Sequence, residues 1–249
     1  FKINGDLRPI LRYPHRKDDD KTGAIVMYES PYKNQKQQVP HNLYVLCHDP
    51  YGQNQSADSM SLGSAYVIKR VNNISTPDDM IVASYVGRPH TQDEYNKNLF
   101  MLADYYNCRI GFENDRGEVI AYAKRHRKMH RLQEEFEMLD KRELRSKTVK
   151  RQYGMHMTEA RKRQGEIYIR DWLNSVRSKN EDGEQILNLH KIYDLALIQE
   201  LIKFNHKGNF DRVMSLMIGM YHTRELYNAE VKEILEDNSA NDWFDKNYY

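Results

Sequence analysis

Short apolar runs alternate with turn-forming residues along the first half of the chain, which is the pattern of β-strands. The run at 44–49 (YVLCHD) ends in an acid, and Pro50 and Gly52 then break it. Two runs rich in β-branched and aromatic residues follow at 62–71 and 80–87, with Asn and Pro between them. We therefore expect an antiparallel meander of three strands.

A helix is predicted after this meander. Thr91 and Glu94 stand at capping-box spacing, and apolar residues follow at helical spacing, which predicts a helix of about 15 residues. It leads to a second short apolar run, at 108–113, that also ends in an acid. A strand reached through a crossover helix lies parallel to the strand with which it pairs, so we expect Asp49 and Glu113 at one sheet edge.

The second half of the chain is mainly helical in pattern. Helical segments are predicted at 117–127, 167–176, 191–205 and from 209 onward. Asp211 falls in the first turn of the last helix, where the helix dipole favours a carboxylate. The segment 153–156 has no clear period and is either a loop or a short strand.

Prolines, charges and polar runs set the expected domain limits. Residues 1–39 contain three prolines and two polar or charged clusters, so we expect a leader or linker from an upstream domain, with one short strand at 24–28. Residues 40–236 are expected to form one domain. The tail at 237–249 is polar and aromatic, and we expect it to fray.

Composition excludes several classes of protein. No apolar run approaches the roughly 20 residues of a membrane helix, and no secretion signal is visible. Cys47 and Cys108 are the only cysteines, and both lie in apolar runs, which argues against a disulfide framework. No Cys/His spacing fits a structural zinc site. We therefore expect a cytoplasmic protein with no membrane partner.

The net charge of +2 hides an uneven distribution. Residues 124–163 contain 14 Lys and Arg against 6 Asp and Glu, whereas the rest of the chain contains 24 against 30. Such a basic sector favours a polyanionic partner, although a solvated helical face is the alternative. The candidate DNA-binding residues are Lys124, Arg125, Arg127, Lys128, Lys147, Lys150 and Arg151.

Three acids stand where elements begin or end, namely Asp49, Glu113 and Asp211. Three carboxylates converging on one edge suit Mg²⁺ or Mn²⁺, and a pair of such ions can support phosphodiester hydrolysis. Each acid alone is more typical of a turn former or a helix-dipole partner. Asp58 could be an additional ligand but more typically caps a loop, and His48 and His206 are expected to be local hydrogen-bonding groups.

The order of these elements and acids resembles the ribonuclease H-like superfamily. Within it, the chain is similar to the nuclease domain of the large terminase subunit of tailed bacteriophages. The resemblance rests on the DPYG loop at 49–52, the ENDRG turn at 113–117 and the stretch 197–216. Where that family often shows His-Asp-Asp, this chain has Asn209-Phe210-Asp211, so only one of the paired acids is present.

The resemblance implies an α/β fold with a mixed sheet of about five strands, flanked by helices. It implies an endonuclease that uses a pair of Mg²⁺ or Mn²⁺ ions to cut concatemeric viral DNA with little sequence specificity. The expected location is the host cytoplasm. Expected partners are double-stranded DNA, the terminase ATPase domain, the small terminase subunit and the portal. No G-x-x-x-x-G-K-[ST] motif occurs, so the ATPase would lie upstream.

Two alternatives stay open at this stage. The first is another ribonuclease H-like nuclease, such as a Holliday-junction resolvase or an integrase core. The second is a non-catalytic DNA-binding or motor-docking module whose acids only cap turns.

Overall fold

The computed structural model describes residues 7–16, 18–52, 61–71, 79–115, 117–136, 153–205 and 208–247, and only the backbone of 231–247. The main sheet has five strands, β1 (Ala24–Met27), β2 (Tyr44–Asp49), β3 (Gly63–Lys69), β4 (Met80–Gly87) and β5 (Ile110–Phe112). Their order is β1-β4-β3-β2-β5, and only the β2–β5 pair is parallel. This is the mixed sheet of about five strands that the sequence predicts.

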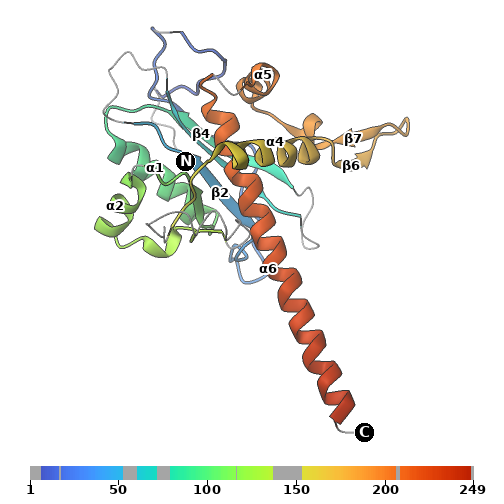
Figure 1. Cartoon of the computed structure of the whole chain (residues 1–249). Coiled ribbons are helices and arrows are strands. Elements are labelled where there is room, and N and C mark those ends of the chain that lie inside the picture. Colours follow the sequence, from blue (N-terminus) through green and yellow to red (C-terminus); the bar gives the residue numbers. More distant parts are fainter. Residues whose placement is uncertain are drawn as a thin grey trace.

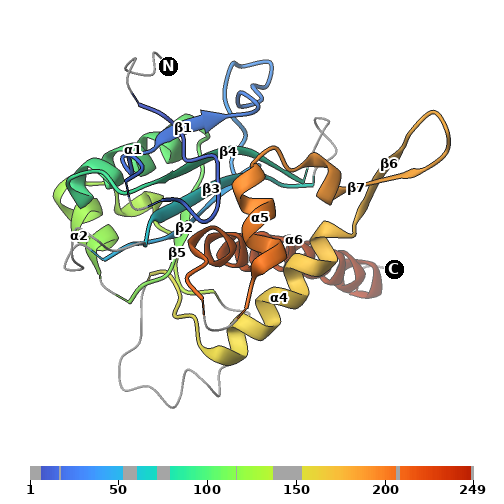
Figure 2. The same cartoon turned by 90° about the horizontal axis from the view of Figure 1, so that it is seen from above.

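Helices cover both faces of this sheet and form a three-layer α/β arrangement (Figure 2). On one face lie α1 (Gln92–Tyr105) and α2 (Glu118–Arg125), and on the other lie α4 (Glu159–Leu173), α5 (Leu195–Lys203) and α6 (Asp211–Asn247). Two short 3₁₀ turns, Met129–Arg131 and Asn188–Lys191, and a hairpin of β6 (Val176–Lys179) and β7 (Gln185–Leu187) complete the described elements.

Strand β2 is buried on both faces because its side chains alternate between two cores. Leu46 packs in the core under α1, whereas Val45 and Cys47 pack in the core under α6. The parity of the strand therefore fixes which face each of its polar residues occupies. Asp49 follows Cys47 by two and points to the α6 face, while His48 points to the α1 face.

Helix α6 lies close against the sheet where Gly219 faces β2. A Cβ atom on Gly219 would stand 2.8 Å from Cys47 Sγ and 2.7 Å from Ile68 Cδ1, closer than carbon side chains normally approach. The absence of a side chain here lets the helix backbone approach the strands. Figure 1 shows that the C-terminal half of α6 continues beyond the sheet. The helix runs to Asn247, so the prediction that the tail frays after 237 is wrong; no Gly or Pro lies between 220 and 247.

Two other sequence predictions differ from the structure. Helix α4 begins at Glu159, eight residues before the predicted segment, and the Thr158 side chain caps it by accepting the Arg161 N–H at 3.3 Å. Its first buried positions are Arg161 and Gly165, which carry no apolar pattern. The β6–β7 hairpin, which follows α4, was not expected.

The segment predicted as a leader contributes to the sheet and packs against α6. β1 pairs with β4, and the Tyr13 ring lies 5.6 Å from the Phe210 ring. Cys47 and Cys108 are free and buried, as expected without a disulfide framework. Among the described residues, none of the helices combines the length and apolar character needed to cross a membrane.

Replacing Gly219 with Ala tests the close approach of α6. The helix propensity of Ala favours the folded state by about 1 kcal/mol, but overpacking against Cys47 and Ile68 costs about 1–3 kcal/mol. We expect a net loss of stability in chemical denaturation. In a Cys47→Ala background the loss should shrink by about 1 kcal/mol, because the sulfur that crowds the new methyl group is gone. Additive losses would contradict this packing.

Candidate metal centre

Asp49 and Glu113 meet because β2 and β5 run parallel. The last paired residues of the two strands are His48 and Phe112, and the Glu113 N–H donates to the His48 carbonyl at 3.3 Å. The next residues, Asp49 and Glu113, have their side chains on the α6 face of the sheet. Asp49 is only 8% exposed, and the charge of Glu113 acts on its carboxyl.

Asp211 reaches the same edge from the first turn of α6. Its carboxylate accepts the Leu62 N–H at 2.8 Å, the Ser61 hydroxyl at 3.3 Å and the Asn209 side-chain amide at 3.1 Å. Leu62 leads directly into β3, whose Ser64 pairs with Asp49 across the sheet. The Asp211 charge accordingly acts on Asp49. Asp211 therefore lies near the end of β2, and a metal site shared by Asp49, Glu113 and Asp211 stays a prediction.

A buried ion pair holds the start of α6 in place. The Glu200 carboxylate, from α5, accepts the backbone N–H groups of Arg212 and Val213 at 2.9 and 3.2 Å. It also accepts from the Arg212 guanidinium at 3.1 Å, and that guanidinium donates to the Ile10 carbonyl at 2.8 Å. Glu200 thereby satisfies N–H groups that lack partners within the helix. The helix turn that carries Asp211 is fixed as a result.

The acids at this edge are difficult to ionise together. Burial, followed by the charges of Asp211 and Glu113, raises the pKa of Asp49 well above its usual range. Burial first, and then the neighbouring Asp115, raises the pKa of Glu113 to about 7. Burial raises the pKa of Asp211 to about 6, although its hydrogen bond from Leu62 opposes the shift. A divalent cation bound by carboxylate oxygens would compensate this charge, so the residues fit such an ion.

The described basic residues divide into two groups. Arg125 pairs with Asp93 and Lys128 with Asp104, both at 2.5 Å. Lys124 and Arg127 are exposed. Contact of any of these residues with DNA stays a prediction. The other candidates, Lys147, Lys150 and Arg151, lie outside the described residues, as do Asp58 and His206.

His48 has a local role. Its ring stacks on Tyr95 of α1 with the centroids 5.1 Å apart, and Nδ1 donates to the Ser64 carbonyl at 3.0 Å. Burial lowers the pKa of His48 to about 4. The ring therefore faces away from the acids and stays neutral, as expected for a hydrogen-bonding group in the core.

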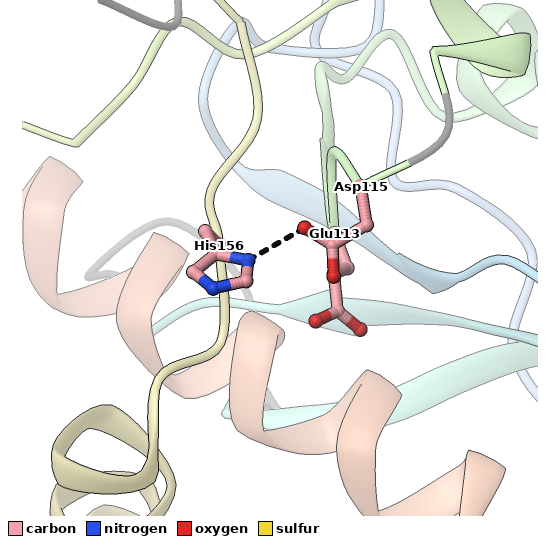
Figure 3. A group of neighbouring side chains, drawn as sticks. All are labelled: Glu113, Asp115 and His156. Carbon is pink, nitrogen blue, oxygen red and sulfur yellow. Dashed lines mark hydrogen bonds and ion pairs between the residues drawn. The ribbon is translucent and has the colours of Figure 1, made fainter. Parts of the chain in front are cut away.

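Two residues near the site were not singled out from the sequence. Within the described part of the chain, Glu113, Asp115 and His156 each offer one ligand atom, and these atoms lie within 4.8 Å of one another (Figure 3). His156 Nδ1 lies 2.5 Å from an Asp115 carboxylate oxygen. Asp115 could have been proposed as a ligand because it stands two residues after Glu113. His156 could not, because the segment 153–156 has no hydrophobic period that predicts its structure.

Stability at different pH values tests whether the acids share one site. A carboxyl with a raised folded pKa stabilises the fold at low pH, and this contribution is lost as the pH rises through the folded pKa. With Glu113 near 7 and Asp211 near 6, that window is about pH 4 to 7. Metal-free Asp49→Asn should therefore be more stable than the parent protein at about pH 8, by at least about 1 kcal/mol, and lose this advantage near pH 5.

The control is Asp182→Asn, which alters an exposed acid in the hairpin turn and should leave the pH profile unchanged. Thermal melts over the pH range give the comparison. A constant difference between Asp49→Asn and the parent protein would show that the acids do not interact.

Comparisons with known proteins returned solved structures but no protein family. No family model and no curated protein matches the chain. The large terminase nuclease of thermophilic phage G20c with bound magnesium is similar at 12% identity and a TM-score of 0.41, over 85% of this chain and 91% of that one. A second structure of that nuclease gives 14% identity and a TM-score of 0.39, over 84% and 91%. These structures come from the group of proteins that the sequence resembles.

Proposed function

We propose that this protein is a metal-dependent endonuclease that hydrolyses DNA phosphodiester bonds. The observation that supports the proposal is that Asp49 and Glu113 end the parallel strands β2 and β5, while Asp211 is held beside the start of β3, the other neighbour of β2. Structural acids that only cap turns have no need to be buried beside one another, and their mutual repulsion costs stability. Carboxylate clusters of this kind are typical of catalytic metal centres.

The proposed roles follow from the positions of the side chains. Asp49, Glu113 and Asp211 would hold Mg²⁺ or Mn²⁺ through their carboxylate oxygens. When bound as a pair, such ions activate a water molecule and stabilise the leaving oxygen. Ser61, Asn209 and the Leu62 N–H orient the Asp211 carboxylate, so that its ligand geometry is set before substrate arrives.

The proposed substrate is double-stranded DNA, recognised through its phosphates. Lys124 and Arg127 are exposed and free to face a polyanion, and contacts of this type position the backbone without distinguishing bases. We therefore expect little sequence specificity. By the resemblance of the sequence, the biological reaction would be cutting of concatemeric phage DNA during packaging, with an ATPase domain, the small terminase subunit and the portal as partners.

Substitution of the three acids tests the nuclease proposal. Asp49→Asn, Glu113→Gln and Asp211→Asn each remove a charged ligand from a shared centre, so each should lower Mn²⁺-dependent nicking of a supercoiled plasmid by at least about 100-fold. Asp182→Asn serves as the matched control and should cut normally. Thermal melts check that each variant is folded.

Cutting retained in all three acid variants would overturn the metal centre. A strong preference for branched over linear DNA would instead favour the resolvase alternative. If the folded parent protein binds DNA but does not cut with either metal, the non-catalytic module becomes the better description.

The basic residues have a test of their own. Charge reversal in a Lys124→Glu/Arg127→Glu variant should weaken DNA binding about equally for different sequences. It should also reduce the slope of log affinity against log salt by about 2 or more. A Lys179→Glu/Lys191→Glu variant, which changes the same number of charges elsewhere, controls for net charge. An equal loss of DNA affinity in both variants would mean that Lys124 and Arg127 do not contact DNA directly and act only through net charge.

A further inference from the structure

Glu113 has acidic neighbours on two sides. On one side lies Asp49, at the end of the paired strand β2, and on the other lies Asp115, with a ligand atom within 4.8 Å of one on Glu113. Asp115 in turn contacts His156 Nδ1. The potential ligands thus continue past the three predicted acids, and Glu113 stands in the middle of the series.

The backbone holds His156 beside this group. The segment around Met155 runs parallel to β5, with the Met155 N–H donating to the Phe112 carbonyl at 2.9 Å and the Asn114 N–H to the Met155 carbonyl at 2.8 Å. Gly154 has a φ of +69°, and a Cβ there would lie 2.7 Å from the Phe112 carbonyl oxygen. The buried Arg161 also donates to the His156 carbonyl at 2.7 Å. The position of His156 is therefore set by the sheet edge and by α4.

The ligand atoms have the spacing that one cation requires. Ligands at about 2.0–2.2 Å from an octahedral ion lie roughly 3 Å apart when adjacent and about 4.3 Å apart when opposite. The atoms offered by Glu113, Asp115 and His156 lie within 4.8 Å of one another, so only small side-chain movements are needed (Figure 3). Asp115 and His156 are partly exposed, with side-chain accessibilities of 38% and 31%, which leaves room for water or phosphate oxygens as further ligands.

We propose that Glu113, Asp115 and His156 bind the second divalent ion of the centre, with Glu113 shared between this ion and the one held by Asp49 and Asp211. This inference rests on the proposed nuclease function. Because Mg²⁺ takes oxygen ligands whereas transition metals accept imidazole nitrogen, the histidine favours Mn²⁺ over Mg²⁺ at this position. The Asp115–His156 contact is then the metal-free form of a ligand pair.

Electron spin echo spectroscopy of the Mn²⁺-loaded protein tests the assignment directly, since it detects a nitrogen bonded to the metal. We expect an imidazole ¹⁴N signal in the parent protein and its loss in His156→Gln. The signal should persist in His130→Gln, which changes an exposed histidine elsewhere, and in Asp211→Asn. Titration should show that His156→Gln lowers affinity for one Mn²⁺ by about tenfold or more and affects Mg²⁺ less.

The outcomes separate this inference from the proposed function. No ¹⁴N signal in the parent protein, or an unchanged signal in His156→Gln, overturns the histidine ligand even if the protein cuts DNA. A signal lost only in His156→Gln supports the site even if no DNA is cut, in which case the nuclease proposal alone fails.

Discussion

Because β5 pairs parallel to β2, Asp49 and Glu113 leave the sheet at the same edge and on the same face. If β5 were antiparallel to β2, its terminal acid would lie at the opposite edge. The helical crossover through α1 makes the parallel pairing possible, and the two-residue alternation of the strands turns both carboxylates toward α6. The parallel pairing of β5 with β2 is therefore the reason that two acids lie at the same edge of the sheet.

Helix α6 then encloses this edge and adds the third acid. Its third turn packs on β2 through Gly219, while its first turn is held by Glu200 and carries Asp211 beside Leu62. Burial of several carboxylates without a nearby cation opposes folding. Among the described carboxyl groups whose pKa shifts are resolved, those with a raised pKa are Asp49, Glu113, Asp211 and Glu200. Of these, Glu200 is paired with Arg212. Arg212 and Lys162 offset only part of the effect of burial on Asp211 and Glu113, and a divalent ion would offset more of it.

The order of β2 to β5 could be predicted because the signals of these strands and of the crossover helix are local. Apolar runs ending in Asp49 and Glu113 and the cap at Thr91 are each visible within a few residues. What could not be predicted depends on contacts between distant segments. The buried face of α4 starts with Arg161 and Gly165, so its first turns carry no apolar pattern, and His156 reaches Glu113 only through pairing of an irregular segment with β5.

A crystal structure of the protein soaked in Mn²⁺, with anomalous scattering recorded at the manganese edge, is the most direct test of the central claim. The account predicts an anomalous peak in contact with the Asp49 and Glu113 carboxylates, with Asp211 as a further ligand. Ordered side chains with no peak at this edge, at a Mn²⁺ concentration that saturates known carboxylate sites, would contradict it.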